Sequence, residues 1–256
     1  MSCLHLRALS VEFSTPDGPL RAVDRVTLDH RAGETLTVIG ETGSGKSVLG
    51  NAIAGLLPDN AHMSGEIVFG DRNLLDLDDR ALSAIRGREI GIVPQNPSLA
   101  LNPTQRIGRQ IGEPLRLHTD LEPKTIRRRV HDQLMRLGFT GVERHLASYP
   151  FELSGGMNQR AVTAASLVAG PRLLIADEPT TGLDAAFSDL VADELIAVTT
   201  AASASLLLIT HDLDLAERIS DRVAVMYGGW IVEEATSHDL FGTPRHPYTQ
   251  ALMSSR

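Results

Sequence analysis

The sequence contains a single cysteine, Cys3, among 256 residues. One cysteine excludes a disulfide bond within the chain, a zinc site built from cysteines and an iron–sulfur cluster held by this chain alone. The histidines show no metal-ligand spacing, so no transition-metal site is expected. The reducing cytoplasm is the compartment that this composition predicts.

Long apolar runs are also absent. No segment reaches the roughly 18 uncharged apolar residues of a membrane-spanning helix; the nearest, residues 190–209, contains Asp193 and Glu194. The first ten residues lack the long apolar centre of a signal peptide. We therefore expect a chain that neither spans nor crosses a membrane by itself.

Basic residues are fewer than acidic ones. The chain has 24 Lys and Arg against 32 Asp and Glu, a net charge of −8. Non-specific binding to nucleic acid needs a basic face and is not expected, and a membrane partner would be a protein surface rather than anionic lipid. The length and the 42% hydrophobic content suffice for one large domain or two lobes.

The segment around which the chain is organised lies at residues 40–47. It reads Gly-Glu-Thr-Gly-Ser-Gly-Lys-Ser and fits the pattern G-x-x-x-x-G-K-[ST] of a phosphate-binding loop. A β-branched run at 34–39 predicts a buried strand before it, and 48–54 predict a helix after it. The alternative is a flexible Gly/Ser turn, but the strand–loop–helix context favours phosphate binding.

The loop's chemistry follows from its residue types. Glycines 40, 43 and 45 allow positive φ and close approach, so that backbone N–H groups at a helix N-terminus point at phosphate oxygens. Lys46 would neutralise the β- and γ-phosphates, and the Ser47 hydroxyl would ligate Mg²⁺. The loop residues expected to contact the nucleotide are Gly40, Thr42, Gly43, Ser44, Gly45, Lys46, Ser47 and Val48.

Residues 172–179 are predicted to form an apolar strand that ends in two carboxylates, Asp177 and Glu178. Open α/β sheets place ligands at the carboxyl ends of their strands. Adjacent residues of one strand point to opposite faces, so we expect Asp177 to hold the Mg²⁺ shell and Glu178 to polarise an attacking water. The alternative is a solvated strand end.

Two further segments carry polar groups at element ends. Ser154, Gly155 and Gly156 open a helix that is predicted to run to Val168, and their N–H groups and hydroxyl could receive a second anion. The alternative is an ordinary helix cap. A buried strand is predicted at 206–212 and ends in the polar pair His211-Asp212, where His211 is either a hydrogen-bonded strand-end histidine or a contact to the γ-phosphate.

The remaining elements complete an alternating α/β order. We expect a loop at 55–64 before a strand at 65–69, and helical residues over 101–146 with Arg127, Arg128 and Arg129 on a solvated face. Paired strands are predicted at 4–13 with 20–29 and at 223–227 with 230–234, strands at 65–69 and 89–93, helices at 78–86, 189–199 and 213–219, and two helical turns in the tail.

Taken together, these motifs resemble an ABC-type ATPase over nearly the whole chain. The phosphate loop, Gln95, residues 153–157, Asp177-Glu178, Gly182-Leu183-Asp184 and His211 occur in that family's order and approximate spacing. The resemblance implies an α/β P-loop NTPase fold, with a RecA-like core, an antiparallel β subdomain and an inserted helical subdomain. Residues 1–256 would form one such domain, with a helical lobe at about 97–160 and a short tail at about 235–256.

The resemblance also implies how the site works. Two subunits would sandwich two ATP molecules head to tail, with Ser154, Gly155 and Gly156 contacting the γ-phosphate on the opposing subunit's loop. Gln95 would touch Mg²⁺ and sense a transmembrane partner, so that Ser47, Gln95 and Asp177 form the metal set. Glu178 would be the general base and His211 the switch histidine, with Lys46 as the third catalytic residue. ATP and Mg²⁺ are the implied cofactors.

Residues 95–97, Leu101-Asn102-Pro103 and His246-Pro247-Tyr248-Thr249 resemble the ATP-binding subunits of oligopeptide, dipeptide and nickel importers. Such a subunit powers import of peptides, nickel or metal chelates from the cytoplasmic face of the inner (plasma) membrane, where it is peripheral. Its partners would be a second, identical or similar ATPase subunit, two permease subunits and, indirectly, an extracytoplasmic solute-binding protein, with no nucleic acid.

Three departures from the family pattern are visible. Met157 stands where the family usually has Gln, and Pro16 stands at the position expected for the aromatic that stacks on adenine, with Phe13 as a substitute or a core residue. The chain stops at Arg256 without the cysteine-ligated cluster of many peptide-importer tails, which favours the nickel or metallophore type.

Two other classes compete with an importer subunit. A non-transport ABC ATPase of DNA repair, translation or cluster assembly is expected to carry a long coiled-coil insert, a second ATPase domain or a different tail. A P-loop small-molecule kinase is disfavoured by Ser154-Gly155-Gly156 and His211.

Overall fold

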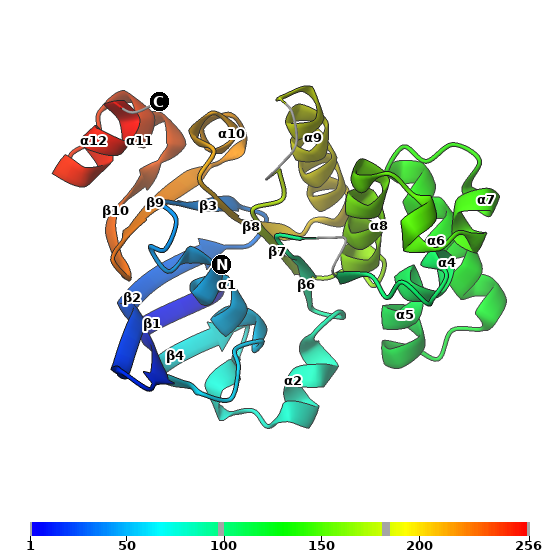
Figure 1. Cartoon of the computed structure of the whole chain (residues 1–256), viewed down its shortest axis with the longest axis horizontal. Coiled ribbons are helices and arrows are strands. Elements are labelled where there is room, and N and C mark those ends of the chain that lie inside the picture. The colour runs from blue at the N-terminus through cyan, green and yellow to red at the C-terminus, as the bar shows by residue number, and fades with distance from the viewer. Residues whose placement is uncertain (1, 97–99, 181–184, 255–256) are drawn as a thin grey trace. The chain divides into compact units, whose positions relative to one another are not determined.

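The computed structural model describes residues 2–96, 100–180 and 185–254, which fall into two compact units (Figure 1). Unit 1 is formed by residues 1–82 with 205–256, and unit 2 by residues 83–204. The first unit therefore contains both ends of the chain, and the second is formed by its middle.

An antiparallel sheet in unit 1 begins the chain. Strands β1 (Ser2–Thr15) and β2 (Gly18–Arg31) form the predicted hairpin, and β4 (Ala61–Phe69) and β5 (Arg72–Asn73) extend the order to β2–β1–β4–β5. Leu4, Leu6, Leu9 and Val11 are buried. The step from position 6 to position 9 breaks the two-residue alternation because Ala8 has a positive φ of 46° and shifts the register there.

The prediction of a loop over 55–64 was wrong in its second half. Strand β4 begins at Ala61, and residues 61–64 pair with β1, for example Ala61 opposite Phe13. Four of the first five β4 residues are exposed, so the segment shows no apolar alternation from which a strand could be predicted. Backbone pairing with a distant strand decided its structure.

A second, largely parallel group of strands in unit 1 carries the phosphate loop. Strand β3 (Thr35–Ile39) lies between β8 (Ser205–Thr210) and β9 (Arg222–Tyr227) and is parallel to both. Strand β10 (Trp230–Thr236) pairs antiparallel with β9, as the Gly228-Gly229 turn predicts. Every residue of β8 is buried, which explains its unbroken apolar sequence.

The helices of unit 1 are short. They are α1 (Lys46–Ala54), the 3₁₀ turn η1 (Leu74–Asp76), α10 (Leu213–Ile219), α11 (Ser237–Gly242) and α12 (Pro247–Ser254); α2 (Asp79–Ile85) contains the boundary with unit 2. The tail helices α11 and α12 lie beside β10 (Figure 1) and contribute Leu240 and Tyr248 to a core cluster that includes Ile39. The tail is therefore packed against the strand that precedes the phosphate loop.

Unit 2 combines a parallel strand pair with helices. Strands β6 (Ile90–Val93) and β7 (Leu173–Asp177) are parallel neighbours. The helices are α4 (Ile107–Ile111), α5 (Glu113–His118), α6 (Pro123–Arg136), α7 (Val142–Ala147), the 3₁₀ turn η2 (Pro150–Glu152), α8 (Gly155–Leu167) and α9 (Ala185–Ala202).

The helical interpretation of residues 101–146 is confirmed. Arg127, Arg128 and Arg129 are exposed, as their spacing predicts, and the apolar residues at helical spacing are buried: Ile107, Ile111, Leu115, Ile126, Val130, Leu134 and Leu137. The chain thus has the fold class of a P-loop NTPase with an antiparallel β subdomain and inserted helices, whereas the limits of about 97–160 for the helical lobe stay a prediction. Within the ranges that the structure describes, no helix is both long and apolar enough to cross a membrane.

Candidate functional site

The phosphate loop needs glycine at two positions for reasons of space. A Cβ atom on Gly40 would lie 2.1 Å from the Met226 carbonyl oxygen, and one on Gly45 would lie 2.3 Å from the Ala22 carbonyl oxygen. Both glycines, and Gly43 between them, have positive φ, as predicted. The loop is therefore enclosed by backbone from β2 and β9 and leads directly into α1.

Lys46, the first residue of α1, is only 5% exposed. Its Nζ donates to the carbonyl oxygens of Gly40, at 2.7 Å, and of Glu41, at 2.9 Å. Ser44 is 6% exposed, and its Oγ has no hydrogen-bond partner among the described residues. A buried ammonium and an unsatisfied hydroxyl in a glycine loop at a helix N-terminus fit a phosphate group. Thr42 is exposed, and Ser47 and Val48 are half-buried.

Two contacts to the loop were not predicted from the sequence. The N–H of Gly229, in the β9–β10 turn, donates to the Ser44 carbonyl oxygen at 2.9 Å. The N–H of Glu41 donates to Tyr248 Oη at 3.1 Å, from the first turn of α12. Both places stood out in the sequence, but for other reasons. Gly228-Gly229 predicted only a turn, and His246 to Thr249 indicated only the resemblance to importer subunits.

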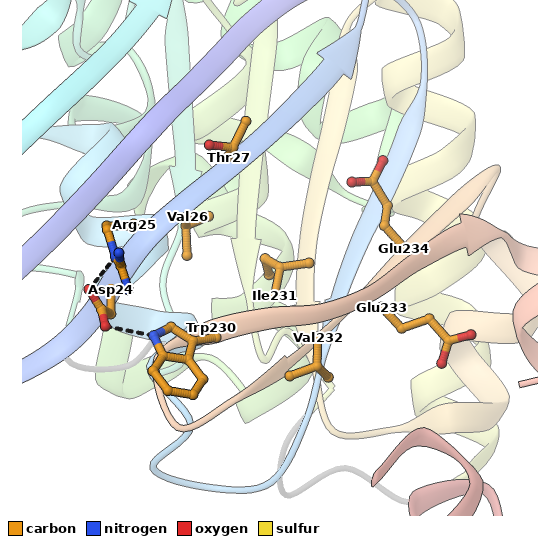
Figure 2. Close-up of a pocket in the computed structure, with 9 residues that line it drawn as sticks. All are labelled: Asp24, Arg25, Val26, Thr27, Trp230, Ile231, Val232, Glu233 and Glu234. Atoms are coloured by element: carbon orange, nitrogen blue, oxygen red, sulfur yellow. Dashed lines mark hydrogen bonds and ion pairs between the residues drawn. The ribbon is translucent and has the colours of Figure 1, made fainter. Parts of the chain in front are cut away.

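A cavity of about 670 Å³ lies next to the Gly229 turn, between β2 and β10 (Figure 2). Gly229 connects it to the loop, because its carbonyl accepts from the Asp24 N–H at 2.9 Å. The half-exposed Trp230 donates from Nε1 to Asp24 Oδ2 at 2.7 Å, and this bond, with Arg21 and Arg25 nearby, lowers the pKa of Asp24 below its usual value. Asp24 therefore stays ionised at the cavity wall.

His211 follows the strand next to β3. Ile39 and Thr210 are opposite each other in the parallel β3–β8 pair, so Gly40 and His211 leave neighbouring strands at the same edge. His211 is exposed, and the next residue, Asp212, caps α10 by accepting from the Leu215 N–H at 3.0 Å. Unit 1 thus brings His211 to the loop's end of the sheet, as the sequence predicts.

Gln95, Asp177 and Glu178 are grouped in unit 2. Val93 and Ala176 are opposite each other in the parallel β6–β7 pair. Asp177 is the last residue of β7, Glu178 follows it, and Gln95 lies just beyond the end of β6. Gln95 is exposed, Asp177 is half-buried and Glu178 is 7% exposed. Within unit 2, the residues predicted to bind metal and to act as the base therefore share one edge of the strand pair.

The alternation argument for the two carboxylates was wrong. Strand β7 ends at Asp177, and Glu178 has a φ of 49°, in the left-handed region, so it is not a strand residue. A non-glycine residue in this region is strained by about 1 kcal/mol or more and is enriched at functional sites. The direction of the Glu178 side chain is set by this backbone turn and not by strand alternation.

Residues 154–156 begin α8 in unit 2. Ser154 is the N-cap, and its Oγ accepts from the Met157 N–H at 3.3 Å. Ser154 and Gly155 are exposed, and a Cβ on Gly155 would meet no atom within 4 Å. The helix start is as predicted, and it presents backbone N–H groups on an open surface.

Two other sequence predictions concern residues 182–184 and the position that would stack on adenine. Gly182-Leu183-Asp184 lies outside the described residues. Pro16 is exposed in the β1–β2 turn, and Phe13 is half-buried on β1 opposite Leu20. An adenine contact by Phe13, in place of an aromatic residue at position 16, stays a prediction.

The fold and these two groups of residues define a nucleotide-binding ATPase of the P-loop class. The ABC transporter family matches residues 23–181, and the chain belongs to it. ATP-binding proteins of this family are ATPases coupled to transport.

Among curated relatives, the oligopeptide transport ATP-binding protein OppD of Bacillus subtilis is 40% identical over 98% of this chain and 71% of its own length. The dipeptide transport ATP-binding protein DppD of Lactococcus lactis is 41% identical over 98% of this chain and 73% of its own length.

Solved structures agree. The ATP-binding cassette MJ0796, a dimer bound to ADP and Pi after hydrolysis, has a TM-score of 0.81 at 26% identity and covers 91% of this chain and 98% of its own. The protein cbiO1 of Clostridium perfringens, part of the ABC transporter complex cbiONQ, has a TM-score of 0.79 at 27% identity and covers 94% of this chain and 91% of its own.

Proposed function

We propose that this chain is the ATP-hydrolysing subunit of a peptide importer. The observation that carries the proposal is the buried Lys46 within a glycine-rich loop, in a chain about 40% identical to peptide-transport ATP-binding proteins over 98% of its length. The family match argues against a small-molecule kinase, and the transport names of these relatives argue against a role in DNA repair, translation or cluster assembly.

The loop residues bind the triphosphate. Lys46 supplies one positive charge to it, and the backbone N–H groups at the start of α1 supply donors aligned with the helix dipole. Ser44 offers its hydroxyl, which is buried and lacks a partner within the described part of the chain. Gly40, Gly43 and Gly45 keep side chains out of this cradle, and Thr42 and Val48 are proposed as further contacts to the nucleotide.

The proposed oxygen ligands for Mg²⁺ are the three residues predicted from the sequence. The Ser47 hydroxyl, the Gln95 side-chain oxygen and the Asp177 carboxylate are the hard donors that this ion prefers. When bound, Mg²⁺ would neutralise charge on the phosphates. The role of the three residues is to present oxygen atoms at the ends of α1, β6 and β7.

Glu178 is the proposed general base. Its carboxylate is buried and belongs to a strained residue directly after β7, which suits a group that must hold a water and accept its proton. His211, at the loop's edge of unit 1, is proposed to contact the γ-phosphate. Glu178→Gln should leave ATP binding intact and reduce hydrolysis by about 10²-fold or more; equal turnover by variant and wild type would reject the assignment.

The proposed assembly contains two ATPase subunits. Ser154 and Gly155 are exposed and Gly156 is half-buried at a helix start, so this start is open to the phosphates on a partner's loop. The partner is an identical or similar subunit, and MJ0796 is named as a dimer. Two permease subunits would hold the pair peripherally at the cytoplasmic face of the inner membrane, with an extracytoplasmic solute-binding protein acting indirectly.

Peptides are the proposed cargo rather than nickel or metal chelates. The supporting observation is that these relatives are named as oligopeptide and dipeptide transport proteins. These names outweigh the expectation of a nickel or metallophore type.

The test is co-expression with the candidate permease subunits, followed by reconstitution in vesicles with the solute-binding protein. Co-purification, and ATP turnover stimulated by peptides but not by Ni²⁺ or a nickel chelate, would support the proposal. Stimulation by nickel alone would replace the cargo. A chain that never associates with a permease and phosphorylates a metabolite would overturn the function itself.

A further inference from the structure

One peptide group of the phosphate loop is held from both sides. The carbonyl oxygen of Gly40 accepts from Lys46 Nζ at 2.7 Å, and the N–H of the same planar peptide, that of Glu41, donates to Tyr248 Oη at 3.1 Å. In a trans peptide these two groups point in opposite directions. The lysine of the loop and a tyrosine of the tail therefore fix the orientation of one peptide unit together.

Tyr248 is itself anchored independently of the loop. Its ring packs against the Tyr227 ring, with centroids 4.3 Å apart. It also packs on the core cluster that contains Ile39, the residue immediately before Gly40. Burial raises the pKa of Tyr248 above its usual value, so the phenol keeps its proton and its oxygen remains a neutral acceptor for the Glu41 N–H.

The rest of the tail motif is tied to β10 through Glu233. The two carboxylate oxygens of Glu233 accept from the Arg245 N–H at 2.8 Å and the His246 N–H at 3.0 Å. The Tyr248 N–H then donates to His246 Nδ1 at 3.2 Å. Figure 2 shows Glu233 and Glu234 on opposite sides of β10, which leaves Glu233 for the tail while Glu234 pairs with Arg222.

Glu233 is ionised in this arrangement. Burial alone would raise its pKa, but the neighbouring Thr249 side chain and the hydrogen bonds from the His246 and Arg245 N–H groups outweigh burial and lower the pKa. An ionised acceptor strengthens the bonds that hold the start of α12. The segment His246 to Thr249 is thus a fixed support for the Tyr248 hydroxyl.

We propose that Tyr248 is a positioning residue that holds the phosphate loop in the orientation that accepts a nucleoside triphosphate. The inference rests on the proposed function, and it gives the His246-Pro247-Tyr248-Thr249 motif a role in nucleotide affinity. The contact acts before the phosphates arrive, because a loop that is already oriented loses less conformational freedom on binding.

The expected size follows from the loss of one hydrogen bond. A net contribution of about 0.5–1.5 kcal/mol corresponds to an affinity change of roughly 2- to 10-fold. Tyr248→Phe removes only the hydroxyl and keeps the ring on Tyr227 and the core. Ser254→Ala is the matched control, because it removes one hydroxyl from the same helix. The Ser254 Oγ donates to the Gln250 carbonyl oxygen and not to the loop.

The experiment measures three quantities on the full chain. A fluorescent ATP analogue gives the nucleotide affinity, urea unfolding gives the stability, and hydrogen exchange without nucleotide reports on the Glu41 amide and on the amides of α12. For Tyr248→Phe we expect an affinity that is 2- to 10-fold weaker and faster exchange at Glu41, with α12 amides as in the wild type. Ser254→Ala should leave the affinity and the Glu41 exchange unchanged.

The outcomes separate the two levels of the argument. Wild-type affinity and unchanged Glu41 exchange in Tyr248→Phe would overturn the role of Tyr248 and leave the proposed function standing. Faster exchange throughout the molecule, with the affinity reduced equally in Ser254→Ala, would overturn it in favour of a general stabilising contact. A wild-type chain that binds no nucleotide would overturn the proposed function.

Discussion

Lys46 and Lys124 are the two lysines of the sequence, and the structure gives them different surroundings. Lys46 is buried among loop carbonyl groups, whereas Lys124 is exposed on α6. An ammonium held close to the phosphate path costs free energy to bury unless it meets negative charge. The contrast indicates that Lys46 is the lysine that would neutralise phosphate charge. Lys124 can serve as the control position.

We expect Lys46→Ala to weaken nucleotide binding by roughly 10- to 100-fold, because a charged hydrogen bond contributes about 1.5–3 kcal/mol. Equilibrium binding of an ATP analogue measures the change, with Lys124→Ala as the control at wild-type affinity. Equal affinities for all three proteins would contradict the phosphate-loop assignment.

A second residue-scale prediction concerns His30, which is 1% exposed on β2. Its Nε2 carries the proton, since it donates to the Glu34 carbonyl oxygen at 2.9 Å, and its Nδ1 has no partner among the described residues. Burial lowers the pKa of His30 below its usual value of about 6.5. Protonation would place a charge and an unpaired N–H in the core.

A lowered folded-state pKa means that the unfolded chain binds the proton first. Stability should therefore be complete above about pH 6.5 and fall as the pH drops towards the folded-state pKa, by at most about 1.4 kcal/mol per pH unit from this group. Urea unfolding of wild type and of His30→Gln between pH 7.5 and 5.5 measures how the free energy of unfolding changes with pH. Identical slopes of stability against pH in the two proteins would refute the assignment.

At the scale of elements, polar ends of strands and helices carry most of the site. The phosphate loop and His211 follow the neighbouring strands β3 and β8, and Gln95 and Glu178 follow the neighbouring strands β6 and β7. Parallel strands place their carboxyl ends at one edge, so residues far apart in the sequence meet there. Ser154 lies at the start of a helix, where its side chain caps α8.

Ser154→Ala should destabilise the chain by about 1 kcal/mol through loss of the α8 cap and should also reduce ATP turnover of the assembled transporter. Thr236→Ala is the matched control, because Thr236 caps α11 by accepting from the Asp239 N–H at 3.2 Å. It should cost similar stability without affecting turnover at a temperature where both variants are folded. An equal reduction of turnover in both variants would assign Ser154 a structural role only.

At the scale of the whole molecule, the residues predicted to contact a nucleotide are divided between the two described units. The loop and His211 belong to unit 1, while Gln95, Glu178 and Ser154 belong to unit 2. The exposure of Ser154 and Gly155 is what a surface completed by a second subunit requires.

We therefore predict that Glu178→Gln, which should bind ATP without hydrolysing it, shifts from monomer to dimer when ATP and Mg²⁺ are added. Light scattering during size-exclusion chromatography measures the mass, in the presence of the partner ATPase if the pair is not identical. The double variant Lys46→Ala, Glu178→Gln is the control and should stay monomeric. ATP-independent mass in Glu178→Gln would contradict nucleotide-driven assembly.

The sequence by itself determined the local elements and the chemistry of the loop. Residues 40–47 need positive φ, small side chains and a lysine, and these are local properties that the residue types state directly. The buried strands β3, β7 and β8 were predictable for the same reason, because their apolar runs have few other places to go. The start of α8 at Ser154 was predictable from its cap.

The tertiary structure alone decided how these elements support one another. Residues 61–64 became a strand through pairing with β1, Glu178 left the strand through a left-handed turn, and Tyr248 reached the Glu41 amide across more than 200 residues of sequence. Each depends on hydrogen bonds or backbone strain that exist only once distant segments are packed together. No local pattern of residue types encodes such contacts, and they are what turn a phosphate-binding motif into an oriented site.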